Sequence, residues 1–260
     1  MLCVALLVAC FACANALVLP EAKVVGGTLA TIYDNIYIVA LLYDFNNTGS
    51  YDQVCGGVIL TRTAVLTAAQ CVVGSLPSQW RIRAGSSYHN SGGQVIQVTL
   101  FKVNELYSPT NLDNDIAILF LATEISFGTT AWSATLPKQA ISVADDTPCS
   151  LTGWGRITSG GITPTQLYKA TVPIVNQAQC ASAYAGYNTL TTNMLCAGRL
   201  GIGGIDACEG DTGGPLICSK ILIGLPSWGR GCGEPQYPGV YTKVSMYRDW
   251  IESNLYTKRN

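Results

Sequence analysis

Residues 210–215 read Gly-Asp-Thr-Gly-Gly-Pro, a run of turn-forming residues in the last quarter of the chain. Alone, such a stretch is often just a turn, because Gly and Pro favour chain reversal. Four other short motifs accompany it, and each of them also has an ordinary explanation. They are Val24-Val25-Gly26-Gly27 after Lys23, residues 66–71 (Leu-Thr-Ala-Ala-Gln-Cys), residues 113–119 (Asp-Asn-Asp-Ile-Ala-Ile-Leu), and Ser227-Trp228-Gly229. Their occurrence together, in this order, is informative.

Between the motifs, short apolar and β-branched segments alternate with Gly, Asn and Ser turns. This spacing is typical of an all-β barrel or sandwich. Only the end looks helical: Tyr247, Trp250, Ile251 and Leu255 share a helical face after Ser245, the candidate N-cap. Residues 131–147 are the candidate linker between two halves. Clear strand patterns cover residues 37–43, 54–60, 65–68, 94–103, 116–120, 221–225 and 239–244.

The composition excludes several classes of protein. The 260 residues carry a net charge of −1, so a nucleic-acid binder, which needs a basic face, is not expected. Eleven cysteines indicate an oxidising compartment. A single histidine, His89, restricts histidine-based catalysis and His-rich metal sites.

Residues 1–16 have the apolar core and the Ala14-Asn15-Ala16 ending of a signal peptide. The run is shorter than the roughly 20 apolar residues that span a bilayer, so we expect a secreted, extracellular protein without a membrane partner. Cys3, Cys10 and Cys13 would leave with this signal. The remaining eight cysteines suit four disulfides, and spacing alone leaves about 105 pairings open.

The five motifs together resemble the trypsin branch of the chymotrypsin-like serine endopeptidases, from Val24 to about Tyr256. The resemblance implies an all-β fold of two six-stranded antiparallel barrels with a short C-terminal helix and a cleft between the barrels. It implies a domain over residues 24–260. It also implies the disulfides Cys55–Cys71, Cys149–Cys218, Cys180–Cys196 and Cys208–Cys232.

Two of the three positions of the catalytic triad differ from the family. Asp115 matches, but the histidine position holds Gln70 and the serine position holds Thr212. A glutamine amide accepts no proton near neutral pH, so Gln70 cannot act as the general base. Thr212 keeps a hydroxyl but adds a methyl group on a stiff side chain. We therefore expect an inactive homologue, a pseudoprotease.

No other residue restores the missing base. His89 lies in a loop that the resemblance places away from the cleft, and a base must reach its proton. Known threonine nucleophiles are N-terminal and use their own amine, whereas Thr212 is internal. A weak or atypical endopeptidase that uses Thr212 remains the alternative.

The rest of the apparatus resembles an intact trypsin. The backbone N–H groups of Gly210 and Thr212 match the oxyanion hole. Asp206 matches the aspartate of a pocket for Lys or Arg, although it could also be a simple loop acid. The other residues that the resemblance assigns to substrate binding are Ser227, Trp228, Gly229 and Gly239.

Activation also looks retained. Residues 17–23 would be a propeptide, cut after Lys23 by an activating trypsin-like protease. The freed Val24 amine would then pair with Asp211 and order the oxyanion loop.

We expect no cofactor and no metal. Residues 86–94, where some trypsins bind calcium, contain no Asp or Glu. Asn46-Asn47-Thr48 is an N-glycosylation sequon. We expect a monomer whose cleft binds a peptide, a protease inhibitor or a protein partner. A secreted structural protein without a cleft ligand is a third hypothesis, which the retained Asp206 disfavours.

Overall fold

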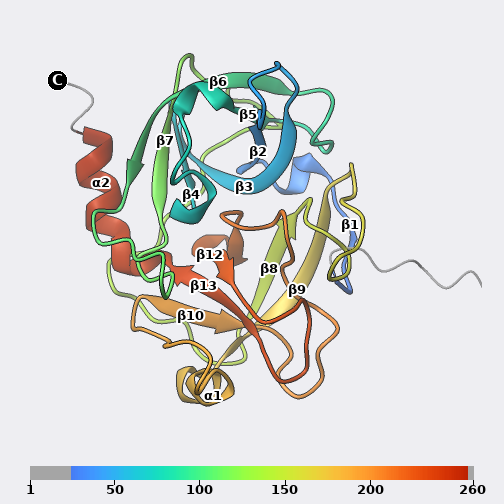
Figure 1. Cartoon of the computed structure of the whole chain (residues 1–260), viewed down its shortest axis with the longest axis vertical. Helices are drawn as coiled ribbons and strands as arrows, with labels where there is room; N and C mark the ends of the chain where they lie inside the picture. The colour runs from blue at the N-terminus through green and yellow to red at the C-terminus, as the bar shows by residue number, and fades with distance from the viewer. Residues whose placement is uncertain (1–24, 257–260) are drawn as a thin grey trace, which may run out of the picture.

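The first half of the chain closes into a six-stranded antiparallel barrel in a computed structural model that describes residues 25–256 (Figure 1). Side chains alternate across a strand, so every second residue points inward. Val39, Leu41, Ile82 and Leu119 are completely buried in this barrel. In spatial order its strands are β2 (Ile38–Tyr43), β3 (Asp52–Thr61), β4 (Ala64–Thr67), β7 (Ala117–Leu121), β6 (Gln94–Val103) and β5 (Trp80–Ala84).

The second half forms a second ring of six antiparallel strands. The ring closes because β9 pairs with β8 on one side and with β10 on the other. A short strand, β1 (Thr28–Leu29), adds to β9 outside the ring. The predicted pair of barrels is confirmed. In ring order the strands are β8 (Pro148–Gly153), β9 (Tyr168–Val175), β10 (Met194–Ala197), β13 (Gly239–Lys243), β12 (Ile221–Trp228) and β11 (Leu216–Cys218).

The predicted C-terminal helix is present as α2 (Arg248–Tyr256), which follows a 3-10 helix, η4 (Val244–Tyr247). Tyr247 and Ile251 are buried in an apolar cluster shared by the outer face of the first barrel and the second barrel. The expectation that Ser245 caps this helix is wrong. Ser245 lies inside η4, is buried, and donates its hydroxyl to the carbonyl of Ile141 at 2.8 Å.

A second helix, α1 (Gln177–Ala183), corrects the expectation that only the end is helical. Its seven residues are too few to show a clear helical period. Asn176 caps it, since its side chain accepts hydrogen bonds from the backbone of Ala178 and Gln179. Among residues 25–256 no helix is long and apolar enough to cross a membrane.

All four predicted disulfides are confirmed: Cys55–Cys71, Cys149–Cys218, Cys180–Cys196 and Cys208–Cys232. The remaining short elements are η1 (Ile32–Asp34), η2 (Ala69–Cys71) and η3 (Pro77–Gln79).

An arginine side chain organises the loop between β5 and β6. Arg83 donates from Nε to the carbonyl of His89 at 2.9 Å and from Nη1 to the carbonyl of Gly92. The Ser86 hydroxyl closes the same loop onto the carbonyl of Ser91 at 2.7 Å. A guanidinium therefore supplies positive charge to loop carbonyl groups.

We predict that Arg83→Gln lowers the free energy of unfolding by about 1–3 kcal/mol, because two loop carbonyls lose charged donors. The control is Arg199→Gln, which changes the same charge at an exposed position. Urea denaturation measures both. The melting temperature of the parent protein should be the same in calcium and in a chelator, and a rise with calcium would contradict the expectation that the protein binds no calcium.

Candidate functional site

Gln70 and Asp115 meet at the edge of the first barrel. Gln70 lies in η2, directly after β4, and Asp115 lies just before β7. The Gln70 backbone N–H donates to Asp115 Oδ1 at 2.8 Å, and Nε2 donates to Oδ2 at 2.5 Å. Asp115 has no solvent exposure. Two of the predicted triad positions are thus in direct contact.

Ser227, in β12 of the second barrel, completes this network. Its hydroxyl donates to Asp115 Oδ2 at 2.6 Å, and its carbonyl accepts from Gln70 Nε2 at 2.7 Å. Burial raises the pKa of Asp115, although hydrogen bonds from Ser227 and Gln70 favour the charged form. Both N–H groups of the Gln70 amide are engaged, so the amide is held in one orientation.

Thr212 lies across the cleft from this network. It is partly exposed, and its backbone carbonyl accepts from the N–H of Gly56 in β3 at 2.8 Å. Gln70 and Thr212 line one cavity of about 320 Å³. Within residues 25–256, no group forms a hydrogen bond with the Thr212 hydroxyl. The hydroxyl therefore has no base to accept its proton.

Two backbone carbonyls of the loop before Thr212 are held by hydrogen bonds from outside the loop. The Glu209 carbonyl accepts from the N–H of Arg156, and the Gly210 carbonyl accepts from Gln53 Nε2, both at 2.8 Å. The described chain offers no acceptor to the N–H groups of Gly210 and Thr212. Gly210 adopts φ +99°, a conformation that disfavours other residues.

Gln53 is a residue that sequence analysis missed. It lies in β3, and its Nε2 also donates to the carbonyl of Cys55 at 2.9 Å. Its Oε1 is buried without a hydrogen-bond partner. Nothing in the sequence marks a glutamine in a strand as a support for a loop that follows 157 residues later.

The predicted substrate-binding residues surround a second cavity, of about 270 Å³. Asp206 is only 3% exposed, and it accepts backbone hydrogen bonds from Ala207 and Gly233. Burial raises its pKa to about 7, and the nearby Asp211 adds to this shift. The walls include the other predicted residues, Thr212, Ser227, Trp228, Gly229 and Gly239.

Glycine is required at one wall of this cavity. A Cβ atom on Gly239 would lie 2.4 Å from Asp206 Oδ1. Any side chain there would push the carboxylate aside, so the open cavity depends on this residue.

Asp211 is the third buried carboxylate of the site, and within the described part of the chain it is held only by backbone groups. It accepts from the N–H groups of Gly155 and Cys208 at 2.8 and 3.1 Å. Burial raises its pKa to about 6. No cationic side chain of residues 25–256 pairs with it. Lys23 and Val24, its expected activation partners, lie outside the described residues.

His89 has a place in the scaffold. Its backbone N–H donates to Thr165 at 3.1 Å and its carbonyl accepts from Arg83. It lines neither of the two cleft cavities. Burial lowers the pKa of its side chain, and the positive charge of Arg83 adds to this effect.

The described residues contain one group of three potential metal ligands, Cys208, Glu209 and Cys232. Both cysteines are bonded to each other as a disulfide, so neither offers a thiolate. This group is not a metal site.

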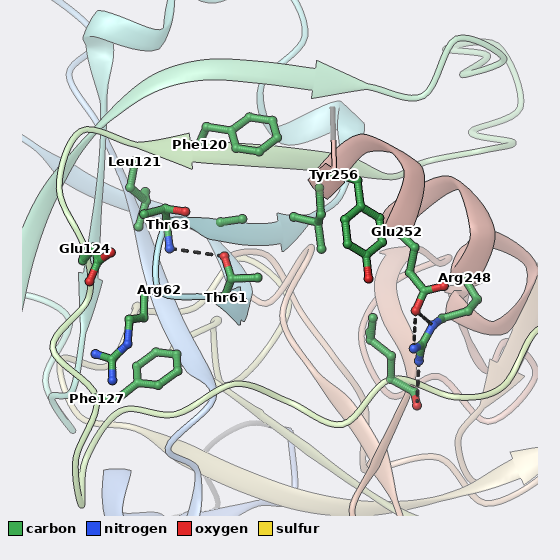
Figure 2. A pocket seen from close by; sticks show the side chains of 13 residues that line it. Thr61, Arg62, Thr63, Phe120, Leu121, Glu124, Phe127, Arg248, Glu252 and Tyr256 are labelled. Carbon is green, nitrogen blue, oxygen red and sulfur yellow. Dashed lines mark hydrogen bonds and ion pairs between the residues drawn. The ribbon is translucent and has the colours of Figure 1, made fainter. Parts of the chain in front are cut away.

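A larger cavity, of about 790 Å³, lies between α2 and the β3–β4 turn (Figure 2). Three of its four charged groups are already engaged: Arg248 pairs with Glu252, and the Arg62 guanidinium lies 4.5 Å from the centre of the Phe127 ring. It shares no lining residue with the two cleft cavities. The acid and hydroxyl groups that occupy the predicted catalytic positions, Asp115 and Thr212, lie at the cleft and not at this cavity.

Two antiparallel barrels with this arrangement in the cleft define the class of chymotrypsin-like serine proteases and their homologues. A family model described as trypsin matches residues 24–251. The chain belongs to the trypsin family, whose members are serine endopeptidases.

Named relatives agree with this assignment. "Trypsin, alkaline C" of Manduca sexta is 41% identical over 251 residues, covering 96% of this chain and 98% of that protein. The "Vitellin-degrading protease" of Bombyx mori is 39% identical over 235 residues, 90% of this chain and 86% of that protein. "Trypsin beta" of Drosophila erecta is 38% identical over 258 residues, 96% of this chain and 98% of that protein.

We predict that Gln70→Leu lowers the free energy of unfolding by about 1–3 kcal/mol, because Asp115 loses a buried donor. The Gln70→Glu variant should lose more at neutral pH, since two carboxylates then face each other. Its loss should shrink as the pH falls, because protonation of one carboxyl restores a donor. Urea titrations at several pH values measure these differences.

The control for this prediction is Gln179→Leu, an exposed position in α1. Equal stability of the Gln70→Leu and Gln179→Leu variants would show that the Gln70 amide does not support Asp115.

Proposed function

We propose that this chain is a secreted, catalytically inactive trypsin homologue that binds a Lys or Arg side chain in the Asp206 cavity. The ligand is a protease inhibitor, a peptide or another protein that presents such a side chain. The observation that carries the proposal is the hydrogen bonding of the Gln70 amide. Both of its amide N–H groups are engaged by Asp115 and Ser227, and no residue of the described chain acts as a base on the Thr212 hydroxyl.

The size of the expected loss in kcat supports inactivity. Loss of the base or the nucleophile from a comparable triad lowers kcat by roughly 10⁶, because the three groups act as one unit. Here the base is absent and the nucleophile carries an additional methyl group. Transition-state stabilisation by backbone N–H groups alone leaves about 10³ over water.

Electrostatics support a cationic ligand. Asp206 is buried, receives only backbone hydrogen bonds, and has no cationic partner among the described residues. An ammonium or guanidinium group in the cavity would supply the missing charge-assisted hydrogen bonds. The exposed carboxylate of Glu209 lines the same cavity and adds negative charge.

An atypical endopeptidase that cleaves after Lys or Arg with Thr212 is the second candidate. One observation favours it: the N–H groups of Gly210 and Thr212 have no acceptor in the described chain, as an oxyanion hole requires. Such an enzyme would still need a base that no described residue supplies.

Activation is part of the proposal. Cleavage after Lys23 by another trypsin-like protease would free the Val24 amine to pair with Asp211. Within residues 25–256 no cationic side chain pairs with the buried Asp211 carboxylate, which supports this step. The predicted signal peptide supports an extracellular location, and the monomeric state is a further expectation.

The first test is an activity assay with an arginyl chromogenic ester and amide after cleavage at Lys23. The parent should be silent, and the Gln70→His/Thr212→Ser double variant should be active, because base and nucleophile return together. Parent turnover above about one hundredth of the rate of the double variant would contradict inactivity, since loss of the triad should cost roughly 10⁶. A silent double variant would show that the cleft itself is not competent.

The second test measures benzamidine binding by calorimetry between pH 5 and 9. Binding needs the charged form of Asp206, whose pKa is about 7. The affinity should therefore be constant above pH 7 and fall below it, approaching about tenfold per pH unit.

Matched variants separate the pocket from general effects. Asp206→Asn should abolish binding, whereas Asp146→Asn, the same change at an exposed position, should leave the affinity and the pH profile unchanged. Binding that survives in Asp206→Asn would refute the pocket assignment.

A further inference from the structure

The loop between β2 and β3 is folded around a buried carboxylate. Asp44 is 4% exposed, and it accepts the backbone N–H groups of Asn46, Thr48 and Gly49 at 3.3, 3.0 and 2.6 Å. Because these bonds use the backbone, they fix the course of the loop while its side chains stay free. Residues 45–50 are all exposed.

This loop presents the sequon Asn46-Asn47-Thr48 in an accessible form. The Asn46 side-chain amide makes no hydrogen bond within residues 25–256. The Thr48 hydroxyl accepts a single long contact, from the N–H of Ser50 at 3.4 Å. The Asn46 amide and the Thr48 hydroxyl, which define the sequon, are therefore accessible to an enzyme.

The loop also borders the cleft. Phe45, the residue before Asn46, is 58% exposed and packs edge-on against Tyr43, with ring centres 4.6 Å apart. Phe45 lines the cavity of about 320 Å³ that contains Gln70 and Thr212. It does not line the Asp206 cavity. A bulky group on Asn46 would therefore stand at the Gln70–Thr212 end of the cleft.

We propose that Asn46 is an N-glycosylation site whose glycan borders the Gln70–Thr212 end of the cleft. Asn46 Nδ2 forms a bond to the anomeric carbon of an oligosaccharide carried by a lipid pyrophosphate. The bond between sugar and phosphate breaks, the lipid pyrophosphate leaves, and one amide proton passes to solvent. The step involves no oxidation or reduction.

The glycan has a consequence that rests on the proposed function. A bulky, hydrated chain at one end of the cleft restricts large ligands more than small ones. Benzamidine should reach Asp206 equally well with or without the glycan, whereas a folded inhibitor that covers the whole cleft should bind more weakly to the glycosylated form.

The test is expression of the full chain in a secretory cell line, followed by intact mass spectrometry before and after treatment with a peptide N-glycosidase. The parent should lose mass, and Asn46 should be converted to Asp. Thr48→Ala should abolish the glycan, and Thr48→Ser should keep it, because a serine hydroxyl still completes the sequon. A parent without glycan on Asn46 overturns the proposal.

Binding measurements distinguish this proposal from the proposed function. If benzamidine fails to bind, the pocket assignment fails while the mass data still decide the glycan. If benzamidine binds, inhibitor affinity should be several-fold higher in Thr48→Ala than in Thr48→Ser. Equal affinities would overturn the placement of the glycan beside the cleft.

Discussion

The close approach of the turn 211–214 to the first barrel is the contact on which the cleft depends. A Cβ atom on Gly213 would lie 2.1 Å from Thr67 Oγ1, and one on Gly56 would lie 2.8 Å from the Cα atom of Gly214. The two barrels meet here backbone to backbone, and the Gly56 N–H donates a hydrogen bond to the Thr212 carbonyl. This contact places Thr212 opposite Gln70 and makes both line one cavity.

Three buried carboxylates around this contact differ in their donors. Asp115 receives side-chain donors from Gln70 and Ser227 in addition to backbone N–H groups. From the described residues Asp206 and Asp211 receive backbone donors only, and burial raises the pKa of each. Asp115 is thus satisfied within the protein, whereas no cationic side chain of residues 25–256 pairs with the other two carboxylates. Asp115 therefore has a structural role, whereas Asp206 and Asp211 are suited to binding positively charged partners.

Much of this arrangement was predictable from the sequence, because the resemblance to trypsins implies both the positions of the motifs and the pairing of the cysteines. The two barrels, the four disulfides and the C-terminal helix were predicted and are confirmed. The short helix α1 and the roles of Ser245, Gln53 and Arg83 were not. The helix α1 is too short to show a helical period, and Ser245 lies in a 3-10 turn. Gln53 contacts a loop 157 residues later, and Arg83 binds backbone carbonyls, so neither role leaves a periodic pattern in the sequence.

The backbone-to-backbone contact also has an evolutionary consequence. The side chains at positions 70 and 212 line an open cavity, so their exchange places no added atom between the closely packed backbones. Glycines 56, 213 and 239 have no such freedom, because any added carbon would collide with a neighbour. Within this architecture the side chains at the catalytic positions are therefore easier to replace than the glycines that position them. Substitutions can remove the catalytic groups while the shape of the cleft is kept.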